Sequence, residues 1–510
     1  MIKSIAIAAA LSTVSMPAVA QTAATAQPAP AAPVSVPAAS IEAMEPEITA
    51  YFEAYMKAGH IPGLVFGIVK DGKLVMVRGL GVQDTATNKA VSADSRFRIA
   101  SMSKAITALA ILKLRDEGKV SLDALAETYV PEMKGWKYPT SDSPRIRVSD
   151  LLHHTAGLVE DNPWGDRFQG QSEAEFTAML KGGMAFAQAP GIRMEYSNYG
   201  YATLGRIVKN VTGMPYQQWI GRNLLAPLGM KSTGYDVFAG PQEARALGYR
   251  WQDDAWVREP DMADGTFGAM GGIQTSANDY WRWVSFLLSA WPARDGADAG
   301  PVKRGTVREI VEGSNFVTMR DRPPVLGAPC RMSVAYAKAW SVIEDCDLGR
   351  YLQHGGGYPG YGSTVILMPD AGVGIFAFSN RTYAGPSLPA LQSLMAIRKA
   401  GLSPVRALPV SEGLAAAYGL AKAAWTSGDP ATAPLTVNVA LDRDLVRRKA
   451  DIAALKTKVG ACTMDEAITP ISAMEGVFNW TCATGKVTGR VQRAPTVAMG
   501  LQVLSFSAGQ

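Results

Sequence analysis

Residues 97–118 read FRIASMSKAITALAILKLRDEG, and this stretch sets a polar Ser-Met-Ser-Lys cluster directly against an apolar run. In the run AITALAIL that follows Lys104, Thr107 is the only polar residue. A helix that is apolar around most of its girth is normally buried, and Gly118 supplies a stop after the charged last turn. The pattern therefore predicts a buried helix over 101–117, whose first turn holds Lys104 close to the interior, where an ammonium group is unfavourable.

The same stretch has an ordinary structural alternative. Ser101 or Ser103 would cap the helix, and Lys104 would reach out to solvent. Because four-letter motifs recur by accident, these residues alone do not separate that alternative from a reactive pair of serine and lysine.

Composition narrows the possible classes of protein. The 510 residues are 47% hydrophobic and 19% charged, which allows a large core and roughly two to four domains. The net charge of +5 is small for so long a chain and favours neither nucleic acid nor an anionic membrane as a partner. After the N-terminal segment no apolar stretch is long enough to span a membrane, so we expect no membrane anchor once that segment is removed.

The N-terminal segment MIKSIAIAAALSTVSMPAVAQ has a lysine, a short apolar stretch and Ala18-Val19-Ala20 ahead of Gln21. This pattern predicts a signal peptide over residues 1–20, cleaved after Ala20, and a periplasmic or secreted protein. Residues 21–40 are rich in Ala and Pro and are predicted to form a disordered linker. No cysteine precedes Cys330, which excludes a lipid-modified N-terminal cysteine.

The four cysteines are even in number, and the expected compartment is oxidising, so we expect disulfides. Three pairings are possible, and we favour the two local ones, Cys330–Cys346 and Cys462–Cys482.

The order of strands and helices predicts an α+β fold. Residues 41–59 are helix-like, and GLVFGIVKDG with KLVMVRGLG reads as a hairpin that turns at Asp71-Gly72. Short apolar-alternating runs return late in the chain, so one antiparallel sheet is expected to join N- and C-terminal segments of a domain over 41–402. The expected middle helices are 148–154, 172–181, 199–211, 216–225 and 277–289. The expected late elements are strands at 335–344, 349–354, 362–370 and 372–380, followed by a helix at 387–401.

The remainder of the chain is predicted to be separate. Residues 403–411 read as a linker, and 412–510 as a small α+β domain of unknown role, with helices near 412–425 and 441–458 before turn-rich strands.

Two further motifs follow the first. In PGIRMEYSNYGYATLGRIV, Tyr196 and Asn198 are two apart, so their side chains face the same way in an extended segment. The structural alternative is a core tyrosine with Asn198 as the cap of a helix that begins near Tyr199. In QHGGGYPGYGS, His354 ends a short strand, and the alternative is a tight glycine turn.

In the order Ser-x-x-Lys, Tyr-x-Asn, His-x-Gly, the three motifs resemble the penicillin-recognising serine hydrolases, a family that includes class C β-lactamases, DD-carboxypeptidases, D-aminopeptidases and related esterases. VSDLLHHTAGL and GGIQTSANDY also resemble that family, and the resemblance covers about residues 41–400. It implies a β-lactamase/transpeptidase-like fold, with an antiparallel sheet flanked by helices and a helical subdomain.

The resemblance also implies roles for the motif residues. Ser101 would be the nucleophile, with Lys104 three residues on and on the same helix face taking its proton. Tyr196 would relay protons, and Asn198 would bind the substrate amide or carbonyl. His354, Gly355 and Gly356 would lie on the strand that edges the site, and the Gly357 N–H would complete an oxyanion hole with that of Ser101.

The third motif departs from the family pattern, because β-lactamases usually carry lysine where this chain has His354. A histidine is only partly charged near neutral pH and holds a substrate carboxylate less firmly. This argues against a dedicated β-lactamase. The second motif is Tyr-Ser-Asn rather than Ser-Asp-Asn, so a deacylation assisted by glutamate is not supported.

Two other catalytic classes are disfavoured. No serine lies in a Gly-x-Ser-x-Gly elbow, as an α/β-hydrolase requires. The pair His153-His154 lacks a His-Glu-x-x-His pattern, and the chain has four histidines in all, so we expect neither zinc nor another cofactor.

The sequence thus predicts an exported serine hydrolase that cleaves ester or amide bonds of a small molecule or peptide through an acyl-enzyme on Ser101. The alternative is a penicillin-binding-like sensor that is acylated but turns over poorly, since both need the same acylation residues. A third possibility places the function in 412–510, which would dock to a partner. The substrate and the oligomeric state stay open.

Overall fold

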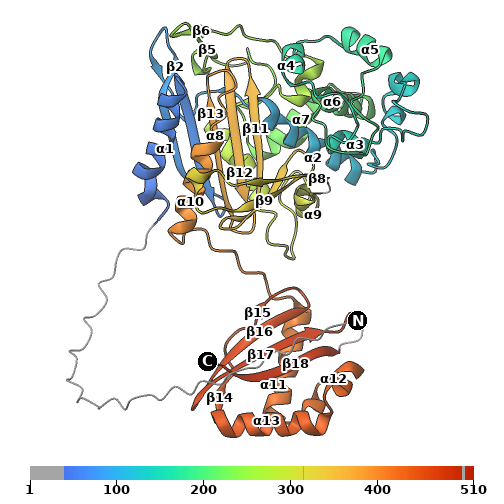
Figure 1. Ribbon diagram of the computed structural model, residues 1–510, viewed down its shortest axis with the longest axis vertical. Coiled ribbons are helices and arrows are strands. Elements are labelled where there is room, and N and C mark those ends of the chain that lie inside the picture. The colour runs from blue at the N-terminus through green and yellow to red at the C-terminus, as the bar shows by residue number, and fades with distance from the viewer. Residues whose placement is uncertain (1–39, 314, 497–499, 510) are drawn as a thin grey trace, which may run out of the picture. The chain divides into compact units, whose positions relative to one another are not determined.

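The computed structural model describes residues 40–313, 315–496 and 500–509 (Figure 1). The predicted signal peptide and all but the last residue of the predicted linker 21–40 lie outside the described residues.

A nine-stranded antiparallel sheet forms the centre of the part that precedes residue 403. Its strand order is β3-β2-β1-β13-β12-β11-β10-β9-β8, so the N-terminal hairpin joins the late strands through the pair β1 and β13. The predicted union of N- and C-terminal segments in one sheet is confirmed. The strands are β1 Gly63–Lys70, β2 Lys73–Asp84, β3 Lys89–Ala90, β8 Asn315–Asp321, β9 Arg331–Tyr336, β10 Ser341–Asp345, β11 Gly349–Tyr358, β12 Tyr361–Met368 and β13 Val373–Ser379.

Strand β1 shows why the centre of this sheet is buried on both faces. Successive side chains of a strand point to opposite faces, and in β1 the alternate residues Leu64, Phe66 and Ile68 enter a different hydrophobic cluster from Val65 and Val69. Helices α1 and α10 supply the first cluster, and α2 and α8 supply the second. Two covered faces explain the almost continuous apolar runs of β1, β12 and β13.

Ten α-helices precede residue 403 among the described residues. They are α1 Glu45–Ala58, α2 Ser103–Asp116, α3 Val148–Leu152, α4 Asn162–Gly165, α5 Glu173–Gly182, α6 Asn198–Thr212, α7 Tyr216–Ile220, α8 Ala277–Leu288, α9 Arg304–Arg308 and α10 Ser387–Lys399. Two short pairs of strands accompany them, β4 Phe97–Arg98 with β7 Gln274–Thr275 and β5 Tyr249–Gln252 with β6 Ala255–Arg258.

Three predicted elements differ in detail. The single strand expected at 335–344 is two strands, β9 and β10, which pair with each other and are joined by residues 337–340, where Ala339 has a left-handed φ of 67°. The helix expected over 101–117 is a 3₁₀ turn, Ala100–Met102, that leads into α2. The helix expected at 216–225 is α7 followed by one π-helical turn, Gly221–Leu225.

Residues 412–509 contain a second sheet and a third hydrophobic cluster, which includes the fully buried Trp480. In place of one helix near 441–458 there are two, because the chain turns into an extended conformation at Arg443, with Asp444 capping the second helix. The helices are α11 Glu412–Ser427, α12 Val437–Asp442 and α13 Leu445–Val459, and the strands are β14 Cys462–Thr463, β15 Thr469–Pro470, β16 Glu475–Cys482, β17 Gly485–Arg493 and β18 Leu501–Gly509.

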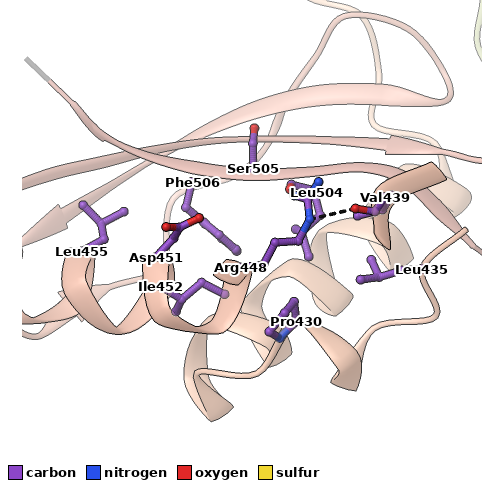
Figure 2. Close-up of a pocket in the computed structure, with 10 residues that line it drawn as sticks. All are labelled: Pro430, Leu435, Val439, Arg448, Asp451, Ile452, Leu455, Leu504, Ser505 and Phe506. Atoms are coloured by element: carbon purple, nitrogen blue, oxygen red, sulfur yellow. Dashed lines mark hydrogen bonds between the residues drawn. The ribbon is translucent and has the colours of Figure 1, made fainter. Parts of the chain in front are cut away.

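A cavity of about 220 Å³ lies between α13 and β18 (Figure 2). Most of its lining is apolar, including Leu435, Ile452 and Leu504. The guanidinium of Arg448 is at the cavity wall, where its Nε donates to the carbonyl of Val439 at 2.9 Å (Figure 2).

The structure contains both local disulfides, Cys330–Cys346 and Cys462–Cys482. The second connects two residues that lie opposite each other in the pair of β14 and β16. Within the described residues, no helix has the length and apolar character required to cross a membrane.

Candidate active site

Ser101 lies in the 3₁₀ turn that precedes α2, and Ala100 before it has a left-handed φ of 48°. A non-glycine residue in this region is strained and persists only where surrounding contacts hold it. Here the Ser363 Oγ of strand β12 donates to the Ile99 carbonyl at 2.8 Å. This hydrogen bond holds the turn against the central sheet. Ser101 itself is buried, with 7% of its surface exposed.

Lys104 is completely buried and does not reach solvent, so the cap-and-solvent alternative is wrong for this lysine. Its Nζ lies 3.1 Å from Ser101 Oγ and donates to Asn198 Oδ1 at 2.6 Å and to the Met270 carbonyl at 2.7 Å. Burial lowers the pKa of Lys104 from 10.5 to about 7, against the opposing charges of Asp166 and Asp161. The amine is therefore partly uncharged at neutral pH.

The second motif lies beside this lysine. The Tyr196 ring centroid is 4.9 Å from Lys104 Nζ, and Asn198 is the first residue of α6. The cap of α6 is Ser197, whose Oγ accepts from the Gly200 N–H at 3.1 Å, so the alternative in which Asn198 caps this helix is wrong. The Asn198 side chain is turned inward, with Oδ1 on Lys104 and Nδ2 donating to Asn162 Oδ1 at 3.2 Å.

The phenol of Tyr196 keeps its proton in the free protein. Burial raises its pKa well above the usual 10.0, a hydrogen bond with Ser101 opposes this rise, and the carboxylates of Asp166 and Asp161 add to it. The structure thus joins Ser101, Lys104, Tyr196 and Asn198 in one cluster, although the last two are about a hundred residues from the first two in the chain.

The third motif is part of a continuous strand, because β11 extends through all three glycines. The alternative of a glycine turn is therefore wrong. His354 is buried, its Nε2 lies 3.2 Å from the Tyr336 hydroxyl, and its Nδ1 lies 2.6 Å from the Gly355 carbonyl. Burial, and then the charge of Lys104, lower the pKa of His354 to about 4, so the imidazole is neutral at physiological pH.

Gly356 explains why this strand needs a residue without a side chain. A Cβ at this position would lie 2.2 Å from the Ile99 carbonyl oxygen and from Ser363 Oγ. At Gly355 the nearest atom would be 3.7 Å away. Gly356 therefore lets β11 approach the turn that carries Ser101. A Cβ on Gly357 would meet the Tyr383 ring at 2.6 Å.

Two buried carboxylates complete the surroundings of the cluster, and the sequence analysis did not single them out. Asp161 accepts from the N–H groups of Asn198 and Tyr199 at 2.7 and 2.8 Å and so fixes the start of α6. Asp166 accepts from the Tyr383 hydroxyl at 3.0 Å, and burial raises its pKa to about 6. They flank the short helix α4 in the stretch DNPWGD, in which no periodic pattern distinguishes them from solvent-exposed acids.

Among the described residues no group of three or more His, Cys, Asp and Glu side chains is placed to hold a metal ion. The His154 ring instead lies against Tyr196, with centroids 4.3 Å apart.

Comparisons with known proteins bear on the same region. Protein flp of Staphylococcus aureus (strain MW2) is 29% identical over 336 residues, which cover 66% of this chain and 62% of that relative. The chain thus spans less than two thirds of the relative's length.

Solved structures share the fold. A β-lactamase/D-alanine carboxypeptidase from Pseudomonas syringae superimposes with a TM-score of 0.53 at 21% identity over 70% of this chain and 98% of that one. An octameric penicillin-binding protein homologue from Pyrococcus abyssi gives a TM-score of 0.55 at 19% identity over 91% of this chain and 99% of that one. At these identities the likeness concerns the fold alone, and it establishes the β-lactamase/transpeptidase-like fold expected from the sequence.

The family model described as Beta-lactamase matches residues 48–398, which include every residue of the cluster around Ser101. A match over this length, on a chain with the corresponding fold, makes the protein a member of the Beta-lactamase family.

Proposed function

We propose that this protein is an exported serine hydrolase that cleaves ester or amide bonds through an acyl-enzyme on Ser101. The observation that carries the proposal is the set of three contacts around Lys104 Nζ. A neutral amine has two N–H groups and one lone pair. The two shorter contacts, to Asn198 Oδ1 and the Met270 carbonyl, use the N–H groups. The third direction, toward Ser101 Oγ at 3.1 Å, is left for the lone pair.

In this arrangement Lys104 is the general base and Ser101 is the nucleophile. The Ser101 hydroxyl proton passes to the amine as Oγ attacks the substrate carbonyl carbon. The Tyr196 phenol, which keeps its own proton in the free protein, then donates that proton to the leaving group and regains one from Lys104. A resting phenolate at Tyr196 is disfavoured by the burial that raises its pKa.

For Asn198, His354 and the three glycines of β11, the roles implied by the resemblance remain proposals. The Asn198 amide is already engaged at both ends, so its first role is to orient Lys104. Backbone N–H groups of Ser101 and Gly357 would stabilise the oxyanion.

The neutral protonation state of His354 favours substrates that carry no carboxylate for it to bind. A neutral imidazole bonded to Tyr336 offers no positive charge to a substrate carboxylate. We therefore propose esters, or amides that do not depend on a carboxylate anchor, as the preferred substrates. The competing substrate classes are those named for the structural relatives, which are a β-lactamase and a D-alanine carboxypeptidase.

Export is proposed on separate grounds. The two disulfides support it, because disulfides are typical of oxidising compartments, and the N-terminal sequence has the pattern of a signal peptide. The separate core of residues 412–509 supports the proposal that this segment is a domain of its own.

The test compares the wild type with Ser101→Ala on short-chain p-nitrophenyl esters, D-aminoacyl anilides, D-Ala-D-Ala peptides and nitrocefin. We expect turnover of esters, and no turnover or fluorophosphonate labelling of the variant. Lys104→Ala and Tyr196→Phe should each slow acylation at least about a hundredfold. Turnover by Ser101→Ala would refute the nucleophile, and a burst without further release by the wild type would favour the sensor.

A further inference from the structure

We propose that His154 is a positioning residue for the acylation: its carbonyl and its ring hold the short segment that carries Tyr196 against Ser101 and Lys104. The inference rests on the proposed function and adds a residue to which neither the three motifs nor their chemistry gives a role.

Two hydrogen bonds to His154 bracket Tyr196. The Glu195 N–H donates to the His154 carbonyl at 2.7 Å, and the Ser197 N–H donates to His154 Nδ1 at 3.1 Å. These are the amides immediately before and after Tyr196. A backbone rotation that moved the phenol would have to break at least one of them. The segment lies between the loop at 183–195 and α6 and has no sheet ladder of its own.

The His154 ring also packs on the phenol directly. Its centroid lies 4.3 Å from that of Tyr196, and 5.0 Å from those of both Tyr201 and Tyr336. Tyr336 in turn forms a hydrogen bond with His354 of the third motif. The His154 ring therefore fills the space between the second and third motifs, and it limits sideways movement of the phenol as well as rotation of its backbone.

The hydrogen bond defines the state of the imidazole. Because Nδ1 accepts from Ser197, the proton of the neutral ring is on Nε2. That atom is buried and has no hydrogen-bond partner among the described residues. Burial, followed by the charge of Lys104, lowers the His154 pKa well below its usual 6.5. The ring stays neutral and brings no second positive charge to the neighbourhood of Lys104.

The backbone conformation of His154 restricts which residues this position accepts. Its φ is 58°, in the left-handed region that non-glycine residues seldom occupy. Asn tolerates this region better than most residues, and its Oδ1 occupies the place of Nδ1 on the same Cγ. Phe keeps a ring but has no acceptor. The two substitutions therefore separate the hydrogen bond from the packing.

The experiment measures the acylation rate constant of His154→Asn, His154→Phe and the neighbouring control His153→Asn with p-nitrophenyl acetate. Rates are expressed per active site, counted by fluorophosphonate labelling of Ser101. We expect His154→Phe to be slower by about a hundredfold, since displacement of a catalytic group by about 1 Å has such an effect. His154→Asn should retain activity within about tenfold, because the acceptor for Ser197 is kept. The control should match the wild type.

Several outcomes would overturn the proposal. One is a wild-type acylation rate per active site in His154→Phe, and another is an equal loss of acylation rate in His154→Phe and His154→Asn. A third is a variant with fewer labelled active sites that each react at the normal rate, which would indicate that His154 serves folding alone. If the acylation rate of the wild type falls at acid pH and that of His154→Asn does not, His154 would be a proton-exchanging group instead. Failure of the proposed function is distinct, because Ser101→Ala would then still be labelled.

Discussion

The rate of acylation should depend on pH through Lys104, and the structure gives the position of that dependence. The reactive form is the neutral amine, and burial lowers its pKa to about 7. Below this pH the neutral fraction falls about tenfold per pH unit. The acylation rate constant at pH 5 should therefore be about a hundredth of its plateau above pH 8, with a limiting slope of one.

The titration of other buried groups can be distinguished from that of Lys104, which causes the fall in rate at acid pH (the acid limb of the profile). His354, with a pKa of about 4, and His154, lower than its usual 6.5, stay neutral over most of this range. Asp166, with a pKa of about 6, titrates inside it. The Asp166 carboxylate raises the pKa of Lys104. In Asp166→Asn the limb should therefore persist and move to lower pH.

The assay is single-turnover acylation by an activated ester between pH 5 and pH 9, in buffers of constant ionic strength, for wild type and Asp166→Asn. Ester hydrolysis without enzyme is subtracted at each pH. A flat wild-type profile would refute the argument that a neutral Lys104 is required. A limb that disappears in Asp166→Asn would assign the titration to the carboxyl group.

Two further predictions use substitutions for which the chain supplies controls. Gly356→Ala should reduce acylation at least about tenfold, because its Cβ would meet the Ile99 carbonyl at 2.2 Å and displace the Ser101 turn, whereas Gly355→Ala should be near wild type; equal effects would contradict this account. Replacing Cys462 and Cys482 together by Ser should destabilise the 412–510 segment by about 3 kcal/mol, the loop-closure value for a separation of 20 residues, measured as faster amide hydrogen exchange in β16; unchanged exchange would contradict it.

The sequence by itself determined much about this protein. Periodicity predicted the N-terminal hairpin, the late strands and the buried helix after Ser101. The alternation of apolar and polar residues in a strand, and an apolar surface all around a helix, are local properties of the sequence. Three short motifs in order predicted the fold and the cluster of Ser101, Lys104, Tyr196 and Asn198. One local pattern was misleading: the apolar run 335–344 is a hairpin, because the chain turns at 337–340. The glycines of His-x-Gly continue strand β11, as the family resemblance implied and the glycine run by itself did not.

Tertiary structure alone decided the chemical state of the site. Lys104 is partly uncharged at neutral pH because the folded chain removes water from it, and its amine is oriented by Asn198 Oδ1 and the Met270 carbonyl, neither of which is near Lys104 in sequence. The same holds for the neutral His354, the carboxyl of Asp166 and the two hydrogen bonds that the amides around Tyr196 donate to His154. Burial and long-range partners set a pKa and an orientation, and a local stretch of sequence contains neither.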